Sequence, residues 1–297
     1  MRLHKIQGHS YYFQGPTNVG IVKYKNSMAL LIDAGLDSTS SRLLAQAVEE
    51  EGLKPKYVVI THAHPDHYGA VKWLKEQYTG LLRYSHPGEA VWMANPRIES
   101  ESFYGARPLR ELENRFLKGP AIEMDFLIEK GKLELGEKNY EILALPGHTY
   151  NQIGVLTSDS VLFVGDSLFS EEIMEKYSFP FLLDIELQLQ TIEKLAQVKA
   201  DYVVLSHAQK VYTSITDLCA KNKARIDEYI EEILEWCYQP CTREDITEKV
   251  LTKNQTEADI PHYYRTHATV GAFLSYLSNR NQLEKAVISG KCYFYRE

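Results

Sequence analysis

The first part of the chain alternates short apolar runs with segments in which the apolar residues have a helical spacing. Short runs that are rich in β-branched residues and bounded by polar or turn residues are typical of buried strands. Such runs occupy residues 20–24, 28–32, 57–60, 140–145, 161–164 and 202–205. At residues 39–51 and 70–77 the apolar positions recur every three or four residues, which predicts helices. The pattern therefore predicts a layered α/β fold.

A long helical pattern replaces the strand pattern after Val211. The elements predicted in this part are helices at residues 216–237, from Thr242 as N-cap, and at about residues 268–279, followed by short strands at residues 286–288 and 292–295. The turn between the two strands contains glycine, which favours a β-hairpin. We therefore expect two domains, residues 1–211 and residues 212–297, and the second has a winged-helix-like outline.

Composition places the chain among ordinary globular proteins. Hydrophobic residues at 44% and charged residues at 25% leave disordered, coiled-coil and collagen-like classes without support. The N-terminus, Met1-Arg2-Leu3 and onward, lacks the apolar stretch of a signal peptide, and no run approaches the ~20 apolar residues of a membrane span. We therefore expect a cytoplasmic protein without a membrane partner. The formal net charge of −7 also argues against general affinity for nucleic acid.

Five predicted strands are followed, at once or within a few residues, by a side chain that can bind a metal ion. These side chains are Asp33, His62, His148, Asp166 and His207. If neighbouring strands end at the same edge of a sheet, the loops that follow them converge on one cleft. The sequence thus predicts a single site. The other histidines outside the segment 61–67 lack such neighbours and are expected to lie outside the site: His4, His9, His86, His262 and His267.

The densest group of candidate ligands is the segment Thr61-His62-Ala63-His64-Pro65-Asp66-His67. His62 and His64 are two residues apart, so in an extended loop they point to one side and can reach one metal ion. Asp66 and His67 then turn to the other side and can bind a second ion. A chance His-x-His-x-Asp-His pattern in a chain of this composition is on the order of one in a thousand. The signal is therefore specific.

This segment resembles the signature of the metallo-β-lactamase-fold superfamily of hydrolases, and four further motifs follow in the family's order. They are Asp33 in Leu31-Ile32-Asp33-Ala34-Gly35, then Pro146-Gly147-His148-Thr149, Val164-Gly165-Asp166-Ser167 and Leu205-Ser206-His207. The match covers roughly residues 15–210. The resemblance implies an αββα sandwich with the site at one edge of two packed sheets, followed here by the small C-terminal helical domain.

The resemblance also implies a role for each candidate ligand. The two implied ligand sets are His62, His64 and His148 for one metal ion, and Asp66, His67 and His207 for the other. Asp166 would bridge the two ions, and Asp33 would orient the ligands without touching metal. Two divalent ions are expected, with Zn²⁺ as the first choice because imidazole and carboxylate ligands suit it, while Fe and Mn are compatible.

Two such ions ~3.5–4 Å apart lower the pKa of a bridging water, so that a hydroxide nucleophile exists at neutral pH. They also polarise a carbonyl or phosphoryl oxygen, so no Ser or Cys nucleophile is required. The departing group must be protonated, and Asp66 or a metal-bound water would serve as the donor.

The Pro-Gly-His-Thr and Gly-Asp motifs together resemble those of glyoxalase II and its hydrolase relatives, which implies cleavage of a thioester or ester in a small-molecule substrate. The C-terminal segment lacks the glutathione-binding tail of glyoxalase II and looks more like the winged-helix-like tail of other hydrolases of the superfamily. Two alternatives use a similar ligand set. One is phosphodiester cleavage, as in ribonuclease Z-like members, and the other is an iron-dependent reaction like that of persulfide dioxygenases.

A non-enzymatic alternative is that the C-terminal domain binds nucleic acid. Residues 213–297 carry 11 Lys and Arg residues and 13 Asp and Glu residues, whereas a DNA-binding module has a basic face. We instead expect Tyr263, Tyr264 and Arg265, just before the predicted last helix, to pack on the metallohydrolase domain or on a second subunit of a homo-oligomer. Residues 95–120 are either a surface helix pair or a roof over the site.

Overall fold

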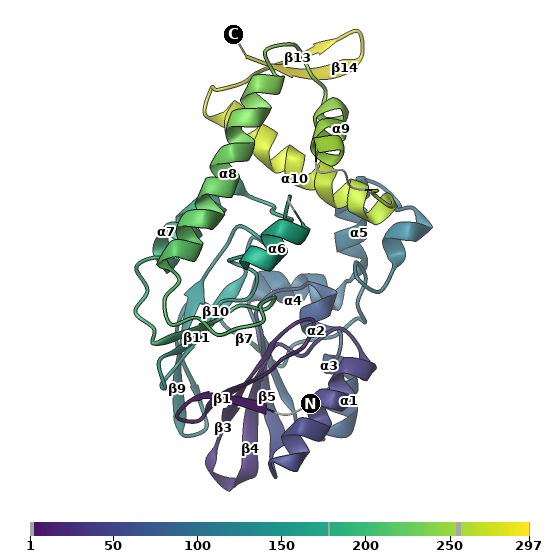
Figure 1. Cartoon of the computed structure of the whole chain (residues 1–297). Helices are drawn as coiled ribbons and strands as arrows, with labels where there is room; N and C mark the ends of the chain where they lie inside the picture. Colours follow the sequence, from purple (N-terminus) through teal and green to yellow (C-terminus); the bar gives the residue numbers. More distant parts are fainter. Residues whose placement is uncertain (1–2, 178, 254–256, 297) are drawn as a thin grey trace.

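The computed structural model of the chain describes residues 3–177, 179–253 and 257–296, so Met1 and Arg2 of the N-terminal segment lie outside the described residues. Two β-sheets pack face to face, and helices cover their outer faces (Figure 1). This arrangement confirms the predicted αββα fold. None of the described helices is both long enough and apolar enough to cross a membrane.

The first sheet has seven strands, and its order follows the chain. Its strands are β1 (Leu3–Gln7), β2 (Ser10–Phe13), β3 (Val19–Lys23), β4 (Met28–Ile32), β5 (Lys54–Ile60), β6 (Leu82–Ser85) and β7 (Phe126–Leu127). Pairing is antiparallel from β1 to β4 and parallel from β4 to β7. Because β4, β5 and β6 run in the same direction, the loops that follow them lie at one edge of the sheet.

Alternate residues of β4 serve two different cores, as the pleat of a strand requires. Leu31 packs beneath helices α1 (Ser38–Glu50) and α3 (Val71–Gln77), while Leu30 and Ile32 face the second sheet. Helix α1 begins at Asp37, whose side chain accepts hydrogen bonds from the Thr39 and Ser40 amides. The short helix η1 (Lys25–Ser27) joins β3 to β4.

The second sheet has five strands. Their order across the sheet is β12 (Tyr202–Val204), β11 (Val161–Phe163), β10 (Ile153–Thr157), β9 (Lys138–Ala144) and β8 (Gly131–Leu135). The two sheets approach closely, since a Cβ atom on Gly20 of β3 would lie 2.5 Å from Cε1 of Phe163. The outer face of this sheet packs against α7 (Ile185–Leu195), and α6 (Glu171–Lys176) precedes that helix.

Three helices and a hairpin form the C-terminal end of the molecule (Figure 1). They are α8 (Thr216–Trp236), α9 (Arg243–Lys253), α10 (Ile260–Asn279), β13 (Glu284–Ile288) and β14 (Lys291–Tyr295). Their apolar side chains belong to the same core cluster as the outer face of the second sheet. Helix α9 has the expected cap, because the Asp245 amide donates to Thr242 Oγ1 over 3.1 Å.

The last helix starts earlier than its apolar pattern predicts, at Ile260 rather than near residue 268. Its N-cap is Asp259, which accepts a hydrogen bond from the His262 amide, and Pro261 occupies the first turn. Proline is favoured there because its missing N–H group would have no partner within the helix. Tyr264 and Arg265 therefore lie inside α10, not in a segment that precedes it.

Candidate metal centre

The segment 61–67 changes from strand to helix within a few residues, and this change separates its ligands. Strand β5 ends at Ile60, and helix α2 (Pro65–Tyr68) begins after His64 as N-cap. Proline at the first helical position has the φ angle that a helix needs. The turn places His62 and His64 in one group of candidate ligands, and the helix places Asp66 and His67 in another, while His62 and His67 also come together with Asp166.

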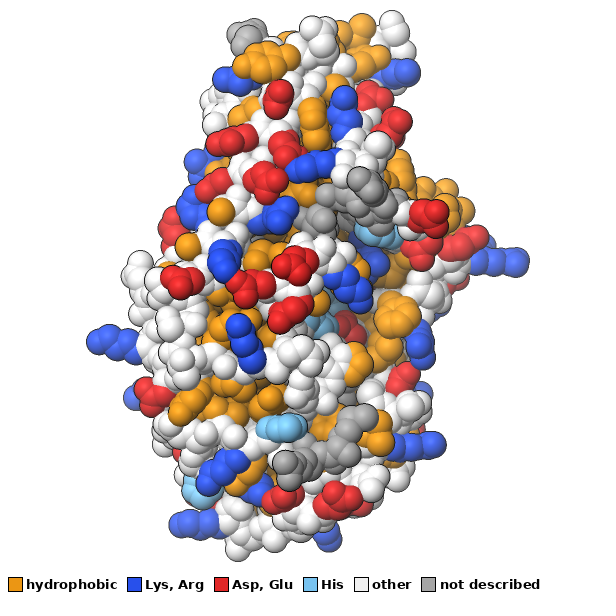
Figure 2. All heavy atoms as spheres, viewed as in Figure 1, with side chains coloured by type: hydrophobic (Ala, Val, Ile, Leu, Met, Phe, Trp, Pro, Cys, Tyr) orange, Lys and Arg blue, Asp and Glu red, His pale blue; other side chains and the backbone are white. Residues whose placement is uncertain are grey.

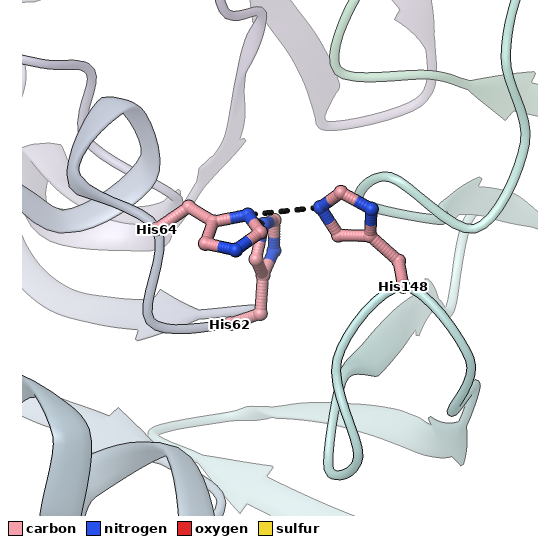
Figure 3. A group of neighbouring side chains, drawn as sticks. All are labelled: His62, His64 and His148. Carbon is pink, nitrogen blue, oxygen red and sulfur yellow. Dashed lines mark hydrogen bonds between the residues drawn. The ribbon is translucent and has the colours of Figure 1, made fainter. Parts of the chain in front are cut away.

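The first ligand group contains His62, His64 and His148, drawn in Figure 3. His64 Nδ1 lies 3.0 Å from His62 Nε2 and 2.8 Å from His148 Nε2, so three ring nitrogens from two loops point to a common centre. His148 reaches this position through the turn at Gly147, whose φ of +136° favours glycine. A Cβ atom there would also lie 2.5 Å from Cα of Gln188.

The second ligand group contains Asp66, His67 and His207. His207 Nε2 lies 3.3 Å from Asp66 Oδ2 and 3.4 Å from Asp166 Oδ2. Asp166 also lies 3.5 Å from His148 Nε2 through Oδ2, and 3.5 Å from His67 Nε2 through Oδ1. Its carboxylate therefore lies between the two groups. The structure thus brings together all seven side chains that the sequence analysis named as ligands.

Four of the five imidazoles have a hydrogen-bond partner on the ring nitrogen that faces away from the centre, and the fifth faces a carboxylate. The contacts are His62 with Thr61 Oγ1 at 3.0 Å, His67 with Asp33 Oδ2 at 2.8 Å, His148 with the Phe181 carbonyl at 2.9 Å, His207 with the Pro16 carbonyl at 2.7 Å, and His64 Nε2 with Glu99 Oε1 at 3.7 Å. A carbonyl oxygen only accepts, so His148 and His207 carry a proton on Nδ1. In their neutral forms, Nε2 is then an unprotonated ligand atom directed inward.

Asp33 connects the first motif to the second, as expected of a residue that orients ligands. Its Oδ1 accepts from the Thr61 amide over 2.8 Å, and its Oδ2 accepts from Thr61 Oγ1 over 3.0 Å and contacts His67 Nδ1. The residue is buried and has a φ of +62°, a conformation that few non-glycine residues adopt. Asp33 thus holds the start of the ligand segment and the orientation of His67 together.

The electrostatics of the site favour a bound cation. Burial lowers the pKa of His64 to about 3, and neighbouring His148 adds to the effect, so this ring is neutral. Burial alone would also lower the pKa of His67, but the carboxylates of Asp66, Asp166 and Asp33 raise it to about 10. Carboxylates that attract a proton this strongly also attract a metal ion.

Two buried atoms in the centre lack any hydrogen-bond partner among the described residues. They are His67 Nε2 and Asp166 Oδ1, which lie 3.5 Å apart. An unsatisfied buried polar atom costs free energy, so each one calls for an explanation. Both atoms are donor types that bind divalent metal ions in proteins. The residues present therefore fit a metal centre.

The sequence analysis missed Glu89, which joins the two loops of the first ligand group. This buried residue of helix α4 (Pro87–Ala94) accepts from the Ala63 amide over 2.8 Å through Oε2, and from Thr149 Oγ1 over 2.7 Å and the Asn151 amide over 3.1 Å through Oε1. Burial raises the pKa of Glu89, and the three donors oppose that rise. No motif marks Glu89, because its role depends only on contacts that form in the fold.

A cavity of about 890 Å³ opens beside the ligands. Apolar and aromatic side chains make up much of its wall, among them Leu43, Phe103, Phe116, Phe169, Phe179 and Phe181. The segment 95–120, which contains α5 (Arg97–Tyr104) and η2 (Arg110–Glu113), contributes to this wall and so forms part of a roof. His262 also lines the cavity, although we expected it to lie outside the site, whereas His86 caps α4 as a structural residue.

Several known proteins with a similar sequence are named as hydrolases. The probable metallo-hydrolase YqgX of Bacillus subtilis is 35% identical over 42% of this chain and 54% of its own length. The hydroxyacylglutathione hydrolase GloC of Haemophilus influenzae is 31% identical over 67% of this chain and 87% of its own length. The chain thus spans about half of the Bacillus protein.

Solved structures extend the likeness of fold to the C-terminal end. A beta-lactamase domain protein from Burkholderia ambifaria has a TM-score of 0.79 at 18% identity and covers 99% of this chain and 93% of its own. A metallo-beta-lactamase family protein from Thermus thermophilus has a TM-score of 0.76 at 19% identity and covers 97% of this chain and 99% of its own. The fold and the ligand groups together define a protein with a candidate metal centre at the edge of two packed sheets, and relatives such as GloC are named as hydrolases.

The family follows from the segment that carries the ligands. A family model described as the metallo-beta-lactamase superfamily matches residues 12–207, which include all seven candidate ligands. The chain therefore belongs to the metallo-beta-lactamase superfamily.

Proposed function

We propose that the chain hydrolyses a thioester or ester in a small molecule with the aid of two divalent metal ions, Zn²⁺ being the first choice. The observation that carries the proposal is the convergence of seven imidazole and carboxylate side chains beside an apolar cavity. His62, His64 and His148 would hold one ion, and Asp66, His67 and His207 the other. Asp166 would be shared.

When bound, the ions would activate water at neutral pH and polarise the carbonyl oxygen of the substrate. The chain contributes an orienting frame and one group that can move a proton. Asp66 lines the cavity, and its Oδ2 accepts a hydrogen bond from Thr17 Oγ1 over 3.0 Å. Burial would raise the pKa of Asp66, but His67 and His207 hold it well below its usual range.

Asp66 is therefore ionised and is better suited to accept a proton than to supply one. In this proposal its free carboxylate oxygen accepts the proton that the attacking water loses and returns it to the departing thiol or alcohol. Asp66, which the sequence analysis named as a proton donor, thus first accepts a proton from the water and only then donates it to the departing group.

The character of the cavity supports thioesters and esters over phosphodiesters. Side chains such as Phe169 and Phe181 bury apolar acyl carbons favourably, whereas a nucleic acid backbone needs many cationic contacts. Lys, Arg, Asp and Glu side chains are interspersed over the C-terminal part of the face drawn in Figure 2, and no broad basic patch covers it. The names of relatives such as GloC of Haemophilus influenzae, a hydroxyacylglutathione hydrolase, point to the same bond type.

The test is elemental analysis of the purified chain together with a panel of acyl thioesters, carboxylic esters and bis-p-nitrophenyl phosphate. We expect two metal ions per chain and turnover of thioesters or esters, both reduced in His64→Ala. The matched control is His9→Ala, an exposed histidine outside the ligand groups. Turnover of the phosphodiester alone would favour the nuclease-like alternative. One iron per chain with oxygen consumption would favour the dioxygenase-like one.

The C-terminal elements, residues 212–297, are proposed as a domain that shapes the cavity or an oligomer interface. Three residues of α10, His262, Arg265 and Thr266, line the cavity. Sedimentation of the full chain tests for an oligomer. Tight, salt-dependent binding of the chain to duplex DNA would contradict a role limited to the cavity and to subunit contacts.

A further inference from the structure

Helix α10 is held firmly over the metal centre by the roof segment. Tyr264 packs in a small apolar cluster with Phe103 and Leu117 of the roof, and its ring lies 5.4 Å from that of Tyr104. Figure 1 shows the start of α10 beside α5. Other side chains of these first turns, His262, Arg265 and Thr266, line the cavity.

Arg265 has no hydrogen bond and no ion pair within 4.0 Å to any residue that the structure describes, and its Nε is buried. The other partly or fully buried arginines within the described ranges all have partners: Arg83 with Asp125, Arg225 with Glu228, and Arg243 with the His267 carbonyl. The Nε–H group of Arg265 is therefore a buried donor without an acceptor, which is costly. Arg265 lines the cavity that contains the metal ligands.

Glu99 is an acidic group near this arginine, but its carboxylate is directed at the metal centre. Its Oε1 lies 3.7 Å from His64 Nε2. Burial raises the pKa of Glu99 well above its usual range, Asp66 adds to the rise, and Arg265 opposes it. Arg265 is thus close enough to interact with Glu99 electrostatically without pairing with it. The cavity wall carries both signs of charge, with Lys176 and Arg265 on one hand and Asp37 and Asp66 on the other.

We propose that Arg265 binds a negatively charged oxygen group, a carboxylate or a phosphate, on the substrate whose acyl bond lies at the metal centre. The planar fork of a guanidinium group matches both anions with two parallel hydrogen bonds. The substrate class is then an anionic acyl thioester or ester, and the C-terminal helix selects it. This inference rests on the proposed hydrolase function for its kinetic test but not for its binding test.

Two matched pairs of thioesters separate the two sources of negative charge. S-butyryl-N-acetylcysteine differs from S-butyryl-N-acetylcysteamine by one carboxylate, and S-butyryl-4′-phosphopantetheine differs from S-butyryl-pantetheine by one phosphate. The metal-loaded full chain is compared with Arg265→Gln, Arg265→Lys and Arg115→Gln. Arg115 is the matched control, since it also lines the cavity but is exposed and paired with Asp37 at 3.1 Å.

We expect Arg265→Gln to raise KM about tenfold to hundredfold for the anionic member of one pair, as for the loss of a charged hydrogen bond. The neutral member should change by less than about threefold, and so should both members in Arg115→Gln. Arg265→Lys keeps the charge but loses the fork, so it should recover part of the loss. The pair that responds identifies the anion.

An equal loss on neutral and anionic substrates would overturn the proposal, because it would show that Arg265 acts only through Glu99 or the fold. Metal content and thermal midpoint are measured for each variant, and Arg265→Lys carries the test if Arg265→Gln does not fold. If the wild-type chain hydrolyses neither thioesters nor esters, the proposed function fails. Binding of the matching S-butyl thioethers, which cannot be hydrolysed, then tests Arg265 separately. A lower Kd for the anionic than for the neutral thioether in the wild type, lost in Arg265→Gln, supports the site.

Discussion

Replacing Glu89 by glutamine tests whether the first ligand group is held in place by the contact between its two loops. The substitution keeps the size of the side chain and exchanges one acceptor oxygen for an NH₂ group. In the wild type, one oxygen accepts from the Ala63 amide and the other from Thr149 Oγ1 and the Asn151 amide. In either orientation, the new NH₂ group therefore faces a backbone N–H that has lost its acceptor.

The cost follows from the burial of Glu89, which is 3% exposed. A buried donor without an acceptor costs about 1–3 kcal/mol. Part of that cost falls on stability, and part falls on the positions of His62, His64 and His148, because the three donors lie in their loops. Loss of a residue that supports metal ligands typically weakens metal binding or activity by about 10–100-fold.

The assay is competition for Zn²⁺ against a chelator of known affinity, with thermal unfolding of the metal-free chain measured in parallel. We expect Glu89→Gln to weaken binding of one ion and to lower the thermal midpoint. Glu76→Gln, an exposed carboxylate on α3, is the control and should leave both unchanged. Wild-type Zn²⁺ affinity and an unchanged midpoint in Glu89→Gln would refute the reasoning.

Three further substitutions test other parts of the centre, and one truncation tests the C-terminal elements. Asp166→Ala should weaken binding of both ions, because this carboxylate lies between the two groups, whereas His62→Ala should weaken chiefly one. Metal content after dialysis separates these outcomes. Wild-type metal content in Asp166→Ala would show that the bridge is misassigned. Asp33→Ala should retain part of its metal but lose about 10–100-fold in affinity or rate, since His67 loses its partner, and wild-type kinetics would contradict this role. Truncation after Val211 keeps all the candidate ligands but removes three helices from a shared apolar core. Binding of a hydrophobic dye and aggregation should therefore increase. Unchanged solubility and substrate preference would argue against packing of the C-terminal helices on the first domain.

The central strands of the fold could be predicted because they are buried on both faces and so form continuous apolar runs. Strand β4 and the end of β5 are examples. Strand β1 was not predicted, because it is an edge strand with the mixed sequence Leu-His-Lys-Ile-Gln and several exposed side chains. The early start of α10 was missed for a different reason, since its apolar pattern predicts a helix only from about residue 268, although Pro261 suits a first turn.

The candidate metal ligands could be named from the sequence because their side chains are chemically distinctive and occur next to strands. For α10, the residue types support the expectation that Tyr263, Tyr264 and Arg265 pack on the metallohydrolase domain or on a second subunit, but they do not show that Arg265 and His262 line the cavity. That contact depends on packing between segments more than a hundred residues apart, such as Tyr104 and Tyr264. Residue types alone therefore indicate the candidate metal centre but not which side chains of α10 line the cavity beside it.

The groups that orient the ligands divide into two kinds, and only one of them has a signature in the sequence. Asp33 supports His67 through a carboxylate, so its residue type matters and its motif could be recognised. His148 and His207 are instead supported by the backbone carbonyls of Phe181 and Pro16. Every residue carries such a carbonyl, so no pattern of residue types marks these two positions. The tautomers that direct Nε2 of both histidines inward thus depend on the path of the backbone, which only the folded structure reveals.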